Sequence, residues 1–190
     1  MFTGMSAAFE GLSDRMQHFI SGLEAVHDFK PFRQLFADDA EGRRSLRDYE
    51  ERYPPVIHPV VRLHPVSGRK VLFVNPQFTV AIAGMEETES RSLLDQLFRQ
   101  AMVPEYQIRH HWRPNTLVFW DNRAVQHYAI HDYYPQRRKM ERVTMKGDKP
   151  VGVPALEGAS VKSQKSTGSA SDTAQHGGHK PMGAKEPERA

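Results

Sequence analysis

The composition of the chain changes near residue 151, and this change limits how much of it can form a packed core. Residues 151–190 contain one leucine, no isoleucine and no aromatic residue. Such a segment cannot bury enough apolar area to offset the ordering entropy of its backbone, which is about 1–2 kcal/mol per residue. We therefore expect one folded domain over residues 1–150 and a disordered tail over residues 151–190.

Composition narrows the classes of protein to consider. The chain has no cysteine, which excludes a disulfide framework, a thiolate metal site and a cysteine nucleophile, so a metal would be held by imidazole and carboxylate groups. Its 26 Lys and Arg barely exceed its 23 Asp and Glu, so neither nucleic acid nor a membrane surface is an expected partner. No apolar run approaches the roughly 20 residues that cross a bilayer, and no signal peptide is evident. A cytoplasmic protein is expected.

The first half of the chain is predicted to alternate between helices and a hairpin. Apolar residues three or four apart predict a helix over residues 9–23, and a sparser stripe predicts a charge-rich helix over residues 31–53 that Pro54 ends. The segment HPVVRLHPVSGRKVLFVN places two β-branched runs around a Pro-Val-Ser-Gly turn, which predicts a hairpin. A further helix is predicted around Leu93 and Leu97, behind several glutamates.

The second half is predicted to be a series of short strands. The candidate strands are residues 106–112, 116–120, 124–129 and 141–146, separated by turn-forming tripeptides such as Arg-Pro-Asn and Asp-Asn-Arg. Short strands in this arrangement favour a sandwich or barrel over a parallel α/β sheet.

The densest group of candidate functional residues is the segment FWDNRAVQHYAIHDYYPQRRKMER, residues 119–142. It places His127 in a strand-like run and brings Arg138 and Arg142 shortly after it. On a strand these two arginines would point to the same face, so both could serve one cavity. Spacing alone does not assign them a role. Asp121 is expected to form a turn and to bond local backbone. Structural roles are also expected for several other histidines of the domain: His58, His64, His110, His111 and His131.

Four segments together resemble one known family, the iron(II)- and 2-oxoglutarate-dependent dioxygenases of the taurine dioxygenase (TauD/TfdA) type. These are HPVVRLHPVSGRKVLFVN, WDNRAVQHYA, DYYPQRRKMERVT and GDKP, which follow the family's order with similar gaps over residues 1–150. The resemblance implies a mainly β fold with α insertions, a partial double-stranded β-helix or jelly roll of the clavaminate synthase-like type. In the family two histidines and one carboxylate hold Fe(II), with 2-oxoglutarate as cosubstrate.

The resemblance also implies roles for individual residues. His127 resembles the more distant histidine ligand of the iron. Arg138 resembles the arginine that grips the distal carboxylate of 2-oxoglutarate, since a guanidinium fork matches a carboxylate. Arg142 resembles the arginine that binds the anionic end of sulfonate or sulfate-ester substrates. Phe78 resembles an aromatic residue of the substrate pocket, although packing in the core explains it equally well.

One part of the family pattern is absent from the sequence. The His-x-Asp pair that supplies the other two iron ligands does not occur at the expected place, because the chain begins MFTGMSAAFEGLSD, which resembles the family just beyond a threonine that helps to hold 2-oxoglutarate. One imidazole is a poor chelator, so the chain is expected to be incomplete as an enzyme.

Two functions follow as hypotheses. The first is an oxidoreductase, part of a dioxygenase that uses Fe(II), 2-oxoglutarate and O2 to hydroxylate a small anionic substrate, with a homo-oligomer or a complementing amino-terminal fragment as partner. The alternative is a non-catalytic remnant, an anion-binding or interaction module that keeps Arg138 and Arg142 but binds no iron.

Overall fold

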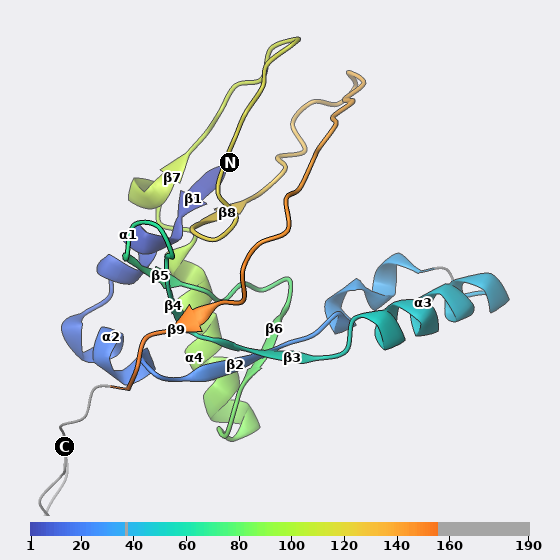
Figure 1. Ribbon diagram of the computed structural model, residues 1–190. Coiled ribbons are helices and arrows are strands. Elements are labelled where there is room, and N and C mark those ends of the chain that lie inside the picture. The colour runs from blue at the N-terminus through green and yellow to red at the C-terminus, as the bar shows by residue number, and fades with distance from the viewer. Residues whose placement is uncertain (37, 156–190) are drawn as a thin grey trace, which may run out of the picture. The chain divides into compact units, whose positions relative to one another are not determined.

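The computed structural model describes residues 1–36 and 38–155 of the chain. Figure 1 shows the order of its elements. The α-helices are α1 (Met5–Glu10), α2 (Asp14–Ile20), α3 (Ala40–Arg52) and α4 (Glu87–Gln100), and the 3-10 helices are η1 (Lys30–Leu35) and η2 (Pro104–Tyr106). The strands are β1 (Phe2–Gly4), β2 (Glu24–His27), β3 (Val56–Pro59), β4 (Val61–Leu63), β5 (Lys70–Leu72), β6 (Thr79–Ile82), β7 (Gln107–Ile108), β8 (Val125–His127) and β9 (Val151–Gly152).

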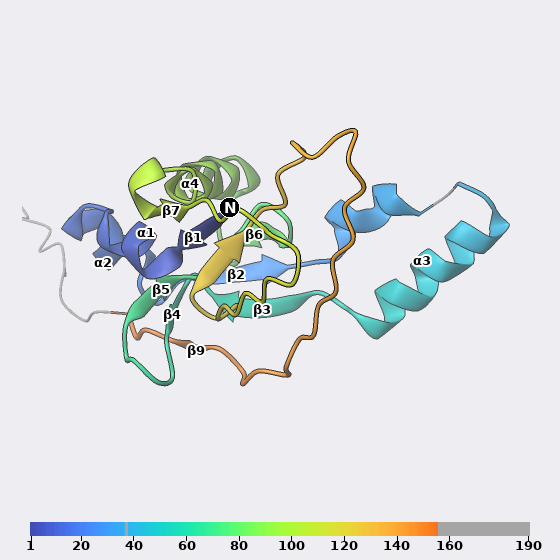
Figure 2. The same cartoon turned by 90° about the horizontal axis from the view of Figure 1, so that it is seen from above.

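These strands form three small antiparallel sheets, with the orders β7-β1-β8, β3-β2-β6 and β5-β4-β9. Helix α1 contacts β5, and α4 lies along β6, as Figures 1 and 2 show from two directions. The most deeply buried large side chains come from these elements and their neighbours: Ile20, Val60, Val61, Val71, Leu72, Val74, Ile82 and Leu97. The core therefore lies between the helices and the two sheets that contain β4 and β6.

Helix α4 and the β4–β5 hairpin confirm the expectations drawn from residue patterns. Leu93, Leu94 and Leu97 form the buried face of α4, and Glu87 and Glu89 occupy its first turn, where carboxylates favour the positive helix start. The hairpin pairs Val61 with Leu72 around the predicted turn. Both elements depend on contacts and turns between residues that are close in sequence, which explains why the sequence pattern predicts them correctly.

The predicted helix over residues 9–23 is instead two short helices followed by a strand. Ser13 separates them because its side chain accepts a hydrogen bond from the Met16 amide (3.4 Å) and so starts α2. Gly22 then turns the chain into β2 with a φ of 85°, and a Cβ there would lie 2.7 Å from the Ala155 Cα. The predicted helix over residues 31–53 is likewise divided into η1 and α3, and it ends before Pro54 as expected.

The strand predictions for the second half are correct only in part. Residues 106–112 contribute the two-residue β7 and residues 124–129 contribute β8, whereas residues 116–120 and 141–146 form no strand. Figure 1 shows residues 109–124 and 128–150 as two arms that leave the sheets and turn back. Leu117, Phe119 and Val143 on these arms are 93%, 82% and 93% exposed. A strand needs a neighbour for its backbone hydrogen bonds, and the described residues provide none here.

The carboxyl end of the folded region differs slightly from its predicted position. Val151 and Gly152 pair with β4, and Val153 is buried, so the first residues assigned to the tail belong to the sheet. The expected disorder of residues 156–190 lies outside the described residues. Among the helices of the described part, none combines the length and apolar character that a membrane span requires.

Candidate functional site

His127 lies on a strand that is fixed by several independent contacts. β8 pairs with β1 through Phe2 opposite His127 and Thr3 opposite Gln126. The Gln126 side-chain amide also donates a hydrogen bond to the Val74 carbonyl (2.7 Å), which ties β8 to the end of the β4–β5 hairpin. The residue predicted to bind metal therefore lies on a strand that these contacts hold in place, although the strand is only three residues long.

The surroundings of His127 are aromatic and cationic. Its ring lies 5.0 Å from the Trp120 ring and 6.3 Å from the Phe2 ring, measured between centroids, and the residue is exposed. Partial burial of the imidazole, then the Arg142 guanidinium, then the amino terminus lower the pKa of His127 below its ordinary value of 6.5. The neutral form, which carries a lone pair, is thus favoured at neutral pH.

The structure places the two predicted arginines differently. Arg142 lies near enough to His127 for its charge to act on that ring, whereas the Arg138 guanidinium lies over the Tyr133 ring at 5.6 Å from its centroid. Both are exposed and neither is on a strand, so the expectation that strand alternation points them to one face is wrong. The reason is again that residues 128–150 have no paired neighbour over most of their length.

Phe78 directly precedes β6, which is in a different sheet from β8. It follows a turn in which the Asn75 side chain accepts hydrogen bonds from the Gln77 and Phe78 amides (3.1 and 2.9 Å). The residue is 39% exposed, and its ring centroid lies 5.1 Å from that of the Phe32 ring. It leads into β6, whereas His127 is on β8 in a different sheet. Phe78 therefore joins an aromatic cluster with η1 and α3, whose other members are Phe29, Phe32, Phe36, Tyr49 and Tyr53.

Asp121 has a wider role than the sequence indicated. As expected it bonds local backbone, accepting from the Arg123 amide (2.8 Å). It also accepts from the Arg123 guanidinium (2.7 Å) and from the His64 ring (3.0 Å). The hydrogen bonds from Arg123, assisted by the one from His64, hold the pKa of Asp121 well below its usual range. Because His64 and Asp121 are 57 residues apart in the sequence, no local sequence pattern indicates this contact.

The contact of buried His27 with half-buried His58 was also not anticipated. The two rings meet edge to face at 5.0 Å, and the His27 Nε2 lies 3.3 Å from the Thr79 hydroxyl. His27 is 8% exposed, and burial, then the neighbouring His58, lower the pKa of His27 to about 4. The alternation of buried Ala25 with buried His27 along β2 is the one signal that could have indicated its burial.

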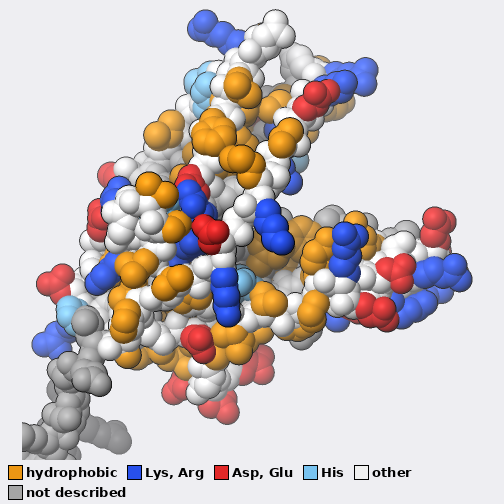
Figure 3. Space-filling model, viewed as in Figure 1, with side chains coloured by type: hydrophobic (Ala, Val, Ile, Leu, Met, Phe, Trp, Pro, Cys, Tyr) orange, Lys and Arg blue, Asp and Glu red, His pale blue; other side chains and the backbone are white. Residues whose placement is uncertain are grey.

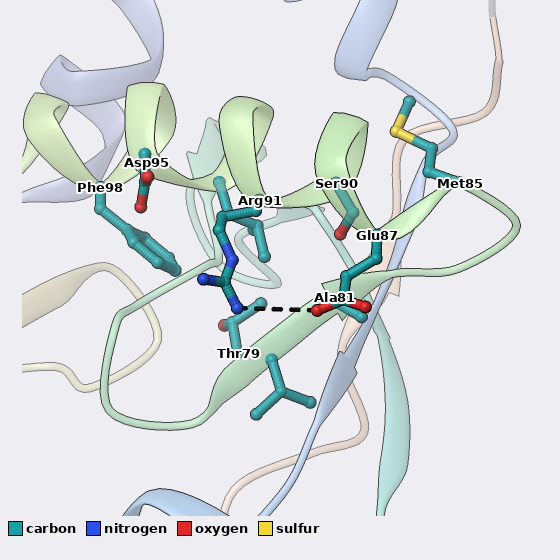
Figure 4. Close-up of a pocket in the computed structure, with 10 residues that line it drawn as sticks. Thr79, Ala81, Met85, Glu87, Ser90, Arg91, Asp95 and Phe98 are labelled. Atoms are coloured by element: carbon teal, nitrogen blue, oxygen red, sulfur yellow. Dashed lines mark ion pairs between the residues drawn. The ribbon is translucent and has the colours of Figure 1, made fainter.

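A groove lies between α4 and β6. Figure 4 shows Arg91 and Glu87 of α4 forming an ion pair (3.7 Å) above Thr79 and Ala81 of β6. The hollow measures about 380 Å³. Its lining, which lies wholly within the described part of the chain, includes none of the four predicted site residues.

A metal ion needs several donor side chains grouped together. Within residues 1–36 and 38–155, no three His, Asp or Glu side chains are grouped so that they could hold an ion. His127 supplies one imidazole, and a facial triad needs two further donors. By themselves, then, the described residues do not fit the complete iron site of the resembled family.

Comparison with known proteins identifies the family. The model of the taurine catabolism dioxygenase TauD, TfdA family matches residues 1–144. The chain belongs to the TauD/TfdA family. The matched range includes all four predicted site residues, so the resemblance carried by the sequence segments is confirmed at the level of the family.

Individual TauD/TfdA relatives agree with this result. The chain is 36% identical over 154 residues to an alpha-ketoglutarate-dependent sulfonate dioxygenase of Saccharomyces cerevisiae, covering 80% of this chain and 36% of that protein. It is 32% identical over 157 residues to an alpha-ketoglutarate-dependent sulfate ester dioxygenase of Pseudomonas putida, covering 80% of this chain and 52% of that protein. The crystal structure of a taurine dioxygenase from Burkholderia xenovorans matches with a TM-score of 0.53 and 34% identity, over 65% of this chain and 37% of that one. The chain thus spans between about a third and a half of the length of these relatives.

Proposed function

We propose that this chain forms part of an Fe(II)- and 2-oxoglutarate-dependent dioxygenase that hydroxylates a small anionic substrate of the alkylsulfonate or sulfate-ester type. The observation that carries the proposal is His127, held on β8 inside the family-matched range with the Arg142 cation beside it. The relatives named for sulfonates and sulfate esters support this class of substrate. Three antiparallel sheets with helices are compatible with part of a jelly roll.

Within this proposal the residues have separate tasks. His127 is one ligand of the iron, and the remaining ligands come from outside the described residues. Arg138 grips the distal carboxylate of 2-oxoglutarate through paired hydrogen bonds, Arg142 binds the substrate anion, and Phe78 lines the substrate pocket. Iron and 2-oxoglutarate together supply the activation of O2, with succinate and carbon dioxide as products. The role of the protein is to bind and orient these molecules.

The proposal includes a polypeptide partner. Figure 3 shows hydrophobic side chains along the two arms, and Leu117, Phe119 and Val143 there are almost wholly exposed. Exposed apolar positions of this kind mark surfaces that another chain covers. A complementing amino-terminal fragment of the same fold, or a second copy of this chain, would supply both apolar cover and backbone hydrogen bonds to the arms.

A chimera tests the proposed function. Residues 1–155 replace the matched region of the Saccharomyces cerevisiae sulfonate dioxygenase, and succinate formation is measured with Fe(II), 2-oxoglutarate and a panel of alkylsulfonates and sulfate esters. We expect turnover that requires all three components, and no 2-oxoglutarate-dependent O2 uptake by the 190-residue chain alone. A chimera that folds, as judged by circular dichroism and gel filtration, yet turns over none of the panel would contradict the proposal.

The same experiment separates the alternative function, an anion-binding module without iron. This alternative is favoured by one observation, the lack of a three-donor metal group among the described residues. It requires the 190-residue chain alone to bind 2-oxoglutarate or a sulfonate without metal, which isothermal titration calorimetry measures. Binding by the isolated chain together with an inactive chimera would support the module over the enzyme.

Arg138→Ala in the active chimera is expected to raise the KM for 2-oxoglutarate about 30-fold while kcat changes little. The reason is that a guanidinium–carboxylate pair of about 2 kcal/mol is lost from binding, and this group lies far from the reacting carbon. Arg137→Ala, one residue away and equally exposed, is the matched control and should leave the KM unchanged. Equal KM values for the two variants would remove Arg138 from the 2-oxoglutarate site.

A further inference from the structure

The His64 ring has a defined orientation and a single proton to donate. Its Nδ1 accepts hydrogen bonds from the Val66 and Ser67 amides (3.4 and 3.1 Å), both in the turn of the β4–β5 hairpin. This leaves the Nε2–H of the neutral ring to donate to the Asp121 carboxylate at 3.0 Å. The side chain of His64 is 12% exposed and that of Asp121 is 35% exposed, so the imidazole is the more shielded side of this contact.

Asp121 transmits this contact to the turn that leads into β8. Its carboxylate accepts from the Arg123 amide (2.8 Å) and from Nε of the same residue (2.9 Å), and its backbone carbonyl accepts from the Ala124 amide (3.1 Å). The Ala124 carbonyl in turn accepts from the Met5 amide (2.9 Å). The hairpin, the turn and the first residue of α1 are thereby connected in series just before the strand that carries His127.

A buried cation reinforces the same network. Arg62 on β4 is 3% exposed and lies over the Phe73 ring, 5.0 Å from its centroid. Its charge interacts favourably with Asp121 and Asp148, while the nearby Arg123 opposes it. A buried arginine of this kind needs a carboxylate close by, so the charge of Arg62 also favours the observed position of Asp121.

β8 needs such an anchor because of its position. Among the described residues it is an edge strand of three residues, paired with β1 alone in the β7-β1-β8 sheet. A short edge strand frays and rotates unless side chains hold it. In addition to the pairing with β1, two contacts connect β8 to the β4–β5 hairpin. One is the hydrogen bond from Gln126 to the Val74 carbonyl, and the other is the Asp121–His64 contact in the turn before β8.

We propose that Asp121 is a positioning residue, which through His64 and Arg123 holds β8 and hence His127 in one orientation. The inference rests on the proposed function in one respect, that His127 is an iron ligand. A ligand displaced by about 1 Å loses much of its value to a metal site, so the anchor sets the geometry that the metal meets.

Hydrogen exchange in the full 190-residue chain without metal tests the anchor directly. The probes are the amides of Gln126, opposite Thr3, and of Tyr128, which donates to the Met1 carbonyl. In Asp121→Asn and in His64→Ala we expect their exchange to accelerate at least tenfold, while the Leu97 amide in α4 exchanges as before. His64→Gln, whose side-chain amide can still donate to the carboxylate, should restore exchange to within about threefold of the parent. That rescue separates positioning from general loss of stability.

The control variant is Asp132→Asn, which removes an exposed carboxylate that pairs with Arg109 on the arms and has no contact with the network. It should leave both probes unchanged. Unaltered exchange at Gln126 and Tyr128 in Asp121→Asn, or acceleration that extends equally to Leu97, would overturn the proposal. Because no metal is present, this result is independent of whether His127→Ala inactivates the chimera, so failure of the anchor and failure of the proposed function are told apart.

Discussion

Substituting His127 by alanine in the active chimera is expected to abolish stable iron binding and to reduce succinate formation on the order of a thousandfold or more. Residues that merely orient a metal ligand are typically worth 10–100-fold, so removal of a ligand itself should cost more. The imidazole is held on β8, and its lowered pKa keeps the ring neutral at the pH of the assay. The measurements are iron per chimera after gel filtration and the rate of succinate formation with saturating 2-oxoglutarate.

The control for this substitution is His111→Ala. His111 is exposed and is on the arm formed by residues 109–124, so its loss should leave iron content and rate close to those of the parent chimera. If His127→Ala retained the iron content of the parent, His127 would not be a ligand, whatever its effect on rate. If both variants lost iron equally, the loss would reflect a general disturbance of the fold and would not identify His127 as a ligand.

Lowering the pH from 7 to 5 is expected to reduce the free energy of unfolding by about 2 kcal/mol through His27 alone. The folded-state pKa of His27 is about 4, below the value of 6.5 that applies to the unfolded chain. Between these values the unfolded state binds more protons, so stability is fully present above pH 6.5 and is lost as the pH falls toward 4. Protonation is resisted because the ring is buried against the Phe73 ring and His58, with Arg62 and Lys149 acting on His58.

Urea unfolding of the 190-residue chain at several pH values between 4.5 and 7.5 measures this dependence of the free energy of unfolding on pH. His27→Asn should lower stability at pH 7 but flatten the dependence on pH, because asparagine does not titrate. His18→Asn removes an exposed histidine of α2 and should keep the slope of the parent. A slope in His27→Asn equal to that of the parent would show that other groups cause the acid sensitivity.

The elements predicted correctly are those that local chemistry determines. The apolar face of α4 needs only the spacing of Leu93 and Leu97, and the end of α3 needs only the proline pair that begins at Pro54. The division of the first predicted helix was missed because a single Ser13 cap outweighs an otherwise continuous apolar pattern. The strands predicted at residues 116–120 and 141–146 are absent from the described structure. Alternation of apolar and polar residues indicates which side chains a strand could bury, but it does not indicate whether a neighbouring strand is present.

For the candidate site, the sequence segments were sufficient to place the chain in the TauD/TfdA family, and the family match over residues 1–144 confirms this. The roles of His127, Arg138, Arg142 and Phe78 stay predictions. What the structure adds is their surroundings: Arg142 near His127, Arg138 over Tyr133, and Phe78 in an aromatic cluster beside another sheet.

Residue identity and short-range spacing are enough to indicate the family, the positions of α4 and the hairpin, and the residues available for chemistry. Which of these residues contact one another depends on how the chain folds in space. The contact of His64 with Asp121 joins positions 57 residues apart, and the low pKa of His27 comes from its burial and then from His58 on the neighbouring strand β3. Hydrogen bonds and burial depend on distance in space, which the order of residues along the chain does not specify.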